Sequence, residues 1–303
     1  MLCNPRQMNL SEPIQVALPR SAQMEPVGPA KIPALMSFEA FRALLAEQPD
    51  LRELQLEGAG EPLAHPRFFD MVSYAAGRGI EVSTTSSLLA ISDARIDECV
   101  ASGLKRLDVN VGTAHPSDLD YLSPGSKLRR ALRNARRISV KRRSLPEIRA
   151  VLFLTRSNLA QIPELLRLAR ANGADAVVLQ HLWHDVCPAR RFVDAQSLLR
   201  EKVDFTQAHA TAAQFGVRLE LPVTTRCEHP WRDIHIGPQG EALPCPKAIT
   251  AQRLNLGNMR RDGVVKVWNN DAYRDFREQL GSANPPALCR RCSVYQAASD
   301  PQR

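Results

Sequence analysis

The chain has no apolar run that approaches the ~18 residues of a membrane-spanning helix. Its N-terminus also lacks the cationic segment and the apolar core of a signal peptide, so we expect a cytoplasmic protein without a membrane segment. The net charge is moderate: the chain has 40 Lys and Arg and 32 Asp and Glu, which give a formal net charge of +8. This balance is far from that of a dedicated nucleic-acid binder, and we expect neither nucleic acid nor a membrane as partner.

Cysteines are few, seven in 303 residues, but four of them are grouped near the C-terminus. Cys227 and Cys245 have seventeen residues between them, and Cys289 and Cys292 form a CxxC pair. In the reducing cytosol, clustered cysteines more often bind metal or catalyse than form disulfides. Four thiolates suit zinc or an iron–sulfur cluster, and unrelated buried cysteines are a third interpretation. The spacing favours iron–sulfur, because zinc ribbons usually carry two CxxC pairs.

Short apolar segments alternate with amphipathic ones from about residue 36 to about residue 220, a pattern typical of βαβ units. Strands are expected over 51–58, 80–87, 104–111, 147–154 and 174–182. One intervening helix begins at Pro66 and ends at Gly79, and another covers 158–173. This alternation predicts a parallel sheet and, with right-handed crossovers, a partial α/β barrel whose active site lies at the carboxyl ends of the strands.

The pattern changes after residue 220. The segment 233–245 predicts a hairpin with its turn at 237–240, and the segment 264–280 predicts one helix. We therefore predict two domains, an α/β barrel over 1–220 and a small α+β module over 221–303. The part of this module between Cys227 and Cys292, about 65 residues, has little core of its own, so a metal or cluster on the four cysteines would supply the missing constraint.

The C-terminal module resembles a known family. Cys227, Gly240 and Cys245, followed by Leu-Gly-Asn at 256–258 and by the CxxC pair, form a series similar to the SPASM/twitch domain of radical S-adenosylmethionine (SAM) enzymes. In the four-cysteine form of that family the thiolates hold one auxiliary [4Fe–4S] cluster. The resemblance implies the same for this chain, with the metal ligands Cys227, Cys245, Cys289 and Cys292.

The resemblance extends upstream, where the segment LQLEGAGEPLAHPRFF at 54–69 is similar to the glycine–glutamate motif of the radical SAM barrel. In that family the motif follows the second strand and binds the methionine end of SAM. The resemblance implies SAM-facing roles for Gly58, Gly60 and Glu61 and a ribose contact for Asn110. It also implies a partial (β/α) barrel of the radical SAM type, and substrates that are peptides, proteins or small molecules.

One family feature is degenerate. Radical SAM proteins carry CxxxCxxC after the first barrel strand, because three thiolates leave one iron open to chelate SAM. The segment CNPRQMNL matches at Cys3 and Asn4, but Gln7 and Leu10 occupy the other two cysteine positions. Neither is a suitable ligand for a cluster iron. We see no room for a first strand before Cys3, so we expect either a truncated N-terminus or a decayed site.

Two functions follow. The first is an accessory or binding protein, with a defective SAM-cleaving site, in a peptide or small-molecule modification pathway that includes an electron donor or partner enzyme. The second is an active radical SAM enzyme, a peptide maturase or small-molecule oxidoreductase, that lacks its N-terminus here. A zinc-binding structural protein is the remaining alternative.

Three further features have ordinary structural interpretations. His181, His184 and Cys187 lie at or just past the end of the strand at 174–182 and could form a replacement metal site, but loop side chains are the simpler interpretation. The segment 127–143 has nine basic residues, no acid and no interleaved aromatic residue, which favours the solvated face of a barrel helix over a nucleic-acid or peptide site. Cys99 is expected to be a small buried helix residue.

Overall fold

The structure is a computed structural model that describes residues 14–18, 36–58, 61–110, 126–181, 198, 202–222, 227–237, 239–245, 248, 254, 256–290 and 292. Its contacts divide the chain into two compact units. Unit 1 consists of Met1–Thr84, Ser102–Leu104 and Glu228–Arg290, and unit 2 of Thr85–Ala101, Lys105–Cys227 and Arg291–Arg303. Each unit contains segments of both predicted domains, so the boundary at 220/221 stays a prediction.

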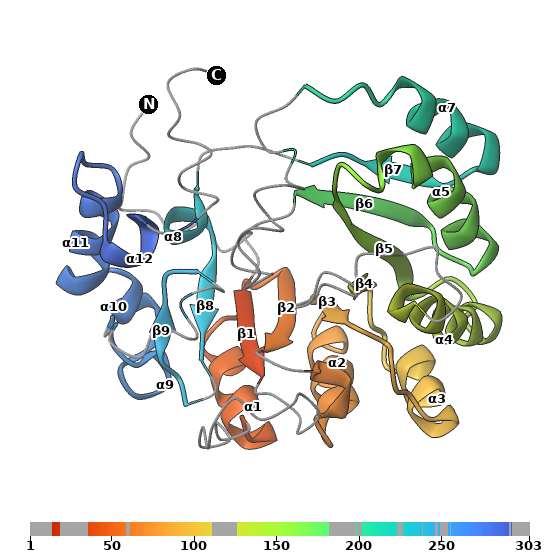
Figure 1. Cartoon of the computed structure of the whole chain (residues 1–303). Helices are drawn as coiled ribbons and strands as arrows, with labels where there is room; N and C mark the ends of the chain where they lie inside the picture. The colour runs from red at the N-terminus through yellow and green to blue at the C-terminus, as the bar shows by residue number, and fades with distance from the viewer. Residues whose placement is uncertain are drawn as a thin grey trace, which may run out of the picture. The chain divides into compact units, whose positions relative to one another are not determined.

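Unit 1 is built around strand β1, which pairs with neighbours from both ends of the sequence (Figure 1). Its strands are β1 Ile14–Leu18, β2 Glu53–Gly58, β3 Glu81–Ser86, β8 Ile234–Ile236 and β9 Ala242–Leu243. β1 is parallel to β2 and to β8, β2 is parallel to β3, and β8 and β9 form the antiparallel hairpin expected from the sequence. β8 thus adds a parallel strand on the side of β1 that faces away from β2, and β9 adds an antiparallel strand next to β8.

The position of β1 corrects one expectation. The sequence analysis looked for the first strand before Cys3 and found no room for it there, whereas the strand lies at Ile14–Leu18, eleven residues after Cys3. Its five residues lie between Pro13 and Pro19, which hid it among turn signals. The segment around Cys3 therefore precedes the first strand, while the family's cysteine motif follows it.

The helices of unit 1 bury their apolar faces. Those of the N-terminal part are α1 Phe38–Ala46, the 3₁₀ turn η1 Pro62–Ala64 and α2 Phe68–Ala76. Those of the C-terminal part are α8 His229–Arg232, α9 Met259–Asp262, α10 Val264–Trp268, α11 Asp271–Leu280 and α12 Ala287–Arg290. α1 begins where the Ser37 hydroxyl accepts a hydrogen bond from the N–H of Ala40, and it buries Phe41 and Leu45.

The single helix predicted over 264–280 is wrong, because the segment forms α10 and α11 with a break between them. Asn270 causes the break. Its side-chain oxygen accepts a hydrogen bond from the N–H of Tyr273 at 2.8 Å and so begins α11, while its amide donates to the carbonyl of Leu256 at 2.8 Å.

The C-terminal part of unit 1 has more core than its length suggested. Its helices bury Met259, Val264, Val267, Tyr273, Phe276 and Leu280. Strand β8 is buried along its whole length and pairs with β1, so the hairpin is anchored on a strand from the other end of the chain. The expectation that this module has little core of its own is therefore corrected.

Unit 2 contains four parallel strands in the order β4 Arg106–Asn110, β5 Glu147–Leu154, β6 Ala176–His181 and β7 Arg218–Glu220. Its helices are α3 Asp93–Ala101, α4 Lys127–Lys141, α5 Ile162–Ala171, preceded by the 3₁₀ turn η3 Leu159–Gln161, and α7 Thr206–Phe215 (Figure 1). The five strands predicted in the α/β region are confirmed in β2 to β6. No helix in the described part of the chain combines the length and apolar character needed to cross a membrane.

The basic segment 127–143 forms α4, and the interpretation as a helix with a solvated basic face is confirmed. The helix buries Leu128, Leu132 and Ile138 on one side, while most of its basic side chains are exposed. Two of them form ion pairs with α3: Arg137 with Asp93 and Lys141 with Asp97. Cys99 is also buried as expected, and burial raises the pKa of its thiol to about 12.

Candidate functional site

Two of the residues implied to face SAM are the last residues of strands. Gly58 is the last residue of β2, and Asn110 is the half-exposed last residue of β4. Glu61 caps η1, because its carboxylate accepts a hydrogen bond from the N–H of Leu63 at 3.4 Å. Gly60 lies outside the described residues. These positions fit the strand ends where α/β enzymes bind ligands, and their SAM-binding roles stay predictions.

The four C-terminal cysteines are divided between the two units. Cys245 follows β9 and Cys289 lies in α12, both in unit 1, while Cys227 and Cys292 belong to unit 2. Cys289 is buried and the other three are half-buried. None of the described cysteines forms a disulfide, so each thiol keeps the chemistry that an iron–sulfur cluster requires. The set of four as joint ligands stays a prediction.

A buried aromatic and cationic cluster, formed by Trp268, Tyr273 and Arg277, lies in the same unit as Cys245. The Tyr273 hydroxyl donates to the carbonyl of Leu243 at 2.9 Å, two residues before Cys245. Burial raises the pKa of Tyr273, while the positive charge of Arg277 opposes this shift. The Arg277 guanidinium lies 4.1 Å from the Trp268 ring centre and 4.4 Å from that of Tyr273, and burial lowers its pKa to about 10.

The proposed replacement metal site at the end of β6 is described only in part. His181 is the buried last residue of β6, whereas His184 and Cys187 lie outside the described residues. A metal site at these three positions therefore stays untested.

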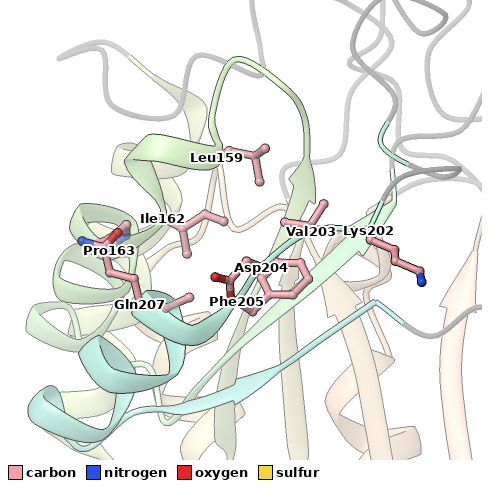
Figure 2. A pocket seen from close by; sticks show the side chains of 9 residues that line it. Leu159, Ile162, Pro163, Lys202, Val203, Asp204, Phe205 and Gln207 are labelled. Atoms are coloured by element: carbon pink, nitrogen blue, oxygen red, sulfur yellow. The ribbon is translucent and has the colours of Figure 1, made fainter.

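Unit 2 also has a groove of about 260 Å³ between the start of α5 and the segment before α7 (Figure 2). Ile162 and Phe205 are among the residues that line it. The carboxylate of Asp204, its one acidic residue, already accepts hydrogen bonds from the N–H and hydroxyl of Thr206. Its other charged lining residue is the exposed Lys202, so the lining offers one carboxylate and no cluster of metal-ligating groups.

The sequence analysis missed one group of polar residues in unit 1. His229, Asp233 and His235 place one ligand atom each within 4.8 Å of one another. The four-residue spacing of His229 and Asp233 could have indicated two side chains on one face of a helix. The burial of His235 in β8 could not be predicted from the sequence.

Comparison with known proteins identifies the C-terminal part directly. Residues 227–293 match the SPASM family, described as an iron–sulfur cluster-binding domain, and this span contains all four C-terminal cysteines. The match confirms the iron–sulfur interpretation over zinc at the level of the domain. The type and number of clusters stay predictions.

The whole chain is similar to curated proteins of related description. It is 27% identical over 284 residues to the PqqA peptide cyclase of Xanthomonas euvesicatoria, with 88% of this chain and 74% of the relative covered. It is 24% identical to the tungsten-containing aldehyde ferredoxin oxidoreductase cofactor-modifying protein of Pyrococcus furiosus, with 86% and 80% covered.

Solved structures show the same fold. Streptococcus suis SuiB bound to S-adenosylmethionine matches with a TM-score of 0.66 at 13% identity, over 95% of this chain and 72% of SuiB. The protein anSMEcpe with bound AdoMet matches with a TM-score of 0.59 at 11% identity, over 95% of this chain and 84% of anSMEcpe. The chain thus shares the α/β fold of these SAM-bound proteins and has a SPASM iron–sulfur domain at residues 227–293. These similarities support the radical SAM family with a C-terminal SPASM domain that the sequence motifs implied.

Proposed function

We propose that this chain is an iron–sulfur protein that does not cleave SAM itself and acts as a binding or accessory protein in a peptide-modification pathway. The observation that carries the proposal is the sequence between β1 and β2. Residues 19–52, where the family places the three cysteines of the SAM-cleaving cluster, contain no cysteine. Reductive cleavage of SAM draws an electron from that cluster, so its absence removes the source of the radical.

The peptide assignment rests on the relatives. The PqqA peptide cyclases are named for a peptide, and SuiB was also solved with the precursor peptide SuiA. A small molecule is the alternative substrate, supported by the cofactor-modifying relative. In either case an electron donor or a catalytic partner enzyme would supply the chemistry that this chain lacks.

We assign one [4Fe–4S] cluster to Cys227, Cys245, Cys289 and Cys292. Four thiolates are the usual ligand set for such a cluster, which supplies electron transfer or a rigid anchor when bound. SAM binding without cleavage is assigned to Gly58, Gly60, Glu61 and Asn110. The exposed part of the Glu61 carboxylate is suited to the SAM ammonium group, while its hydrogen bond to Leu63 fixes its position.

The reconstituted and reduced protein should form no 5′-deoxyadenosine from SAM, because no set of three thiolates is available to hold the cleaving cluster. Iron analysis should give about four iron atoms per chain, consistent with one cluster. The measurement is product quantification by mass spectrometry, with an intact radical SAM enzyme as positive control. Product that increases with the amount of reductant would instead support the active-enzyme alternative.

Restoring cysteines near Cys3 should not rescue cleavage. The double variant Gln7→Cys, Leu10→Cys completes a CxxxCxxC segment, but this segment precedes β1, whereas the family's motif follows the first strand. The two ends of a five-residue strand are about 13 Å apart. We expect iron content and SAM turnover to equal those of the unmodified chain. A gain to about eight iron atoms would place the ancestral motif at Cys3 after all.

A further inference from the structure

Three side chains of unit 1 converge at the start of the hairpin. His229 is the first residue of α8, Asp233 ends that helix, and His235 is the middle residue of β8. The Nδ1 atom of His229 lies 2.5 Å from Oδ2 of Asp233, and Nε2 of His235 lies 3.9 Å from the same oxygen. The two imidazole rings meet edge to face, with centroids 5.5 Å apart.

His235 is the unusual member of this group. Only 2% of it is exposed, and its Nε2 atom has no hydrogen-bond partner among the described residues although it faces Asp233. Leaving such a buried polar atom unsatisfied costs about 1–3 kcal/mol. Its backbone pairs with Gln15 of β1 and Leu243 of β9, so the main chain of His235 is fixed within the sheet. A further ligand at Nε2 would remove this cost.

We propose that His229, Asp233 and His235 form a binding site for a divalent first-row transition metal ion, distinct from the cysteine ligands. Ligand atoms bound about 2.0–2.2 Å from one ion are about 3.0–3.6 Å apart. The observed separations, from 2.5 Å up to at most 4.8 Å, bracket this value. Closing the widest separation from at most 4.8 Å to about 3.6 Å, and opening the shortest from 2.5 Å to about 3.0 Å, would bring all three atoms to one ion.

The chemistry of the ligands defines the ion. Two imidazole nitrogens and one carboxylate favour Zn²⁺, Fe²⁺ and their neighbours over Mg²⁺ and Ca²⁺, which prefer oxygen. Three ligands leave at least one coordination position. The side chain of His229 is 41% exposed, so water or a small anion can reach that position.

Zn²⁺ is the probe for this site. Full-length protein with its cluster reconstituted is incubated with Zn²⁺, passed over a desalting column with a weak chelator, and analysed for zinc and iron. We expect about one zinc per chain in addition to the iron. The variants Asp233→Asn, His229→Gln and His235→Gln should each lower zinc affinity at least about 100-fold and leave the iron content unchanged.

The matched control is His209→Gln, because His209 lies exposed on α7 and should not affect zinc binding. If the buried His235→Gln variant does not fold, the half-exposed His229 and the isosteric Asp233→Asn change still test the site. The Co²⁺ complex should show d–d bands without thiolate charge transfer. The proposal is overturned if the wild type keeps no zinc, if the three variants keep as much as the wild type, or if thiolate charge transfer shows that cysteines hold the ion.

Discussion

Replacing both cysteines of the CxxC pair, Cys289→Ala with Cys292→Ala, should reduce the iron content from about four atoms per chain to nearly none. Two thiolates cannot hold a cubane cluster whose four irons each need a ligand, so the visible charge-transfer absorption should disappear with the iron. The measurement is iron analysis and the absorption spectrum after anaerobic reconstitution. Single replacements should give intermediate values, because three thiolates can retain a cluster with one open iron.

The matched control for the CxxC variant is Cys99→Ala. Cys99 is fully buried in α3 and lies outside the matched span 227–293, so its removal should leave the iron content unchanged. The far-ultraviolet circular dichroism of the double variant should stay close to that of the wild type, because β8 pairs with β1 and the helices around Tyr273 have their own core. A full iron complement in the double variant, or one tightly bound zinc in place of iron, would contradict the assignment.

The sequence predicted those elements whose signals are local. The strands β2 to β6 are runs of apolar residues bounded by turn residues, and α5 places Leu165, Leu166 and Ala169 on one buried face. The spacing of the four cysteines favours an iron–sulfur domain over a zinc ribbon, and the match to the SPASM family confirms this interpretation. In each case the sequence pattern and the structural element lie in one continuous part of the chain. The prediction therefore did not depend on a contact with a distant segment.

The elements that the sequence analysis missed depend on distant or competing contacts. β1 is a short strand between two prolines and is stabilised by pairing with β2 and with β8, which is more than 200 residues away. The break between α10 and α11 depends on Asn270, whose side chain bonds both Tyr273 and Leu256. For the same reason His235 could not be identified as a buried ligand, because its burial follows from the pairing of β8 with β1.

Arg277 on α11 is the buried cation that joins three helices of unit 1. Its Nε atom donates to the carbonyl of Pro230 in α8 at 2.6 Å, and its Nη1 atom donates to the carbonyl of Trp268, the last residue of α10, at 2.9 Å. A cation at a helix C-terminus also stabilises the unpaired carbonyl groups there. Because α8 begins two residues after Cys227 and carries His229, Arg277 supports the segment that holds the proposed ligands.

Replacing Arg277 by Ala should lower the free energy of unfolding by about 3–5 kcal/mol. Two buried carbonyls lose their hydrogen-bond donor, and the contacts of the guanidinium with the Trp268 and Tyr273 rings are lost. The smaller side chain also leaves a cavity. Arg277→Met keeps most of the volume and should cost less, about 1–3 kcal/mol. Arg274→Ala, on the same helix but exposed and paired only with Asp271, should change the free energy by less than about 0.5 kcal/mol. Chemical denaturation of the three variants at equal cluster loading measures the difference. Equal stabilities of Arg277→Ala and Arg274→Ala would show that the buried guanidinium is not what holds α8 and α10 on α11.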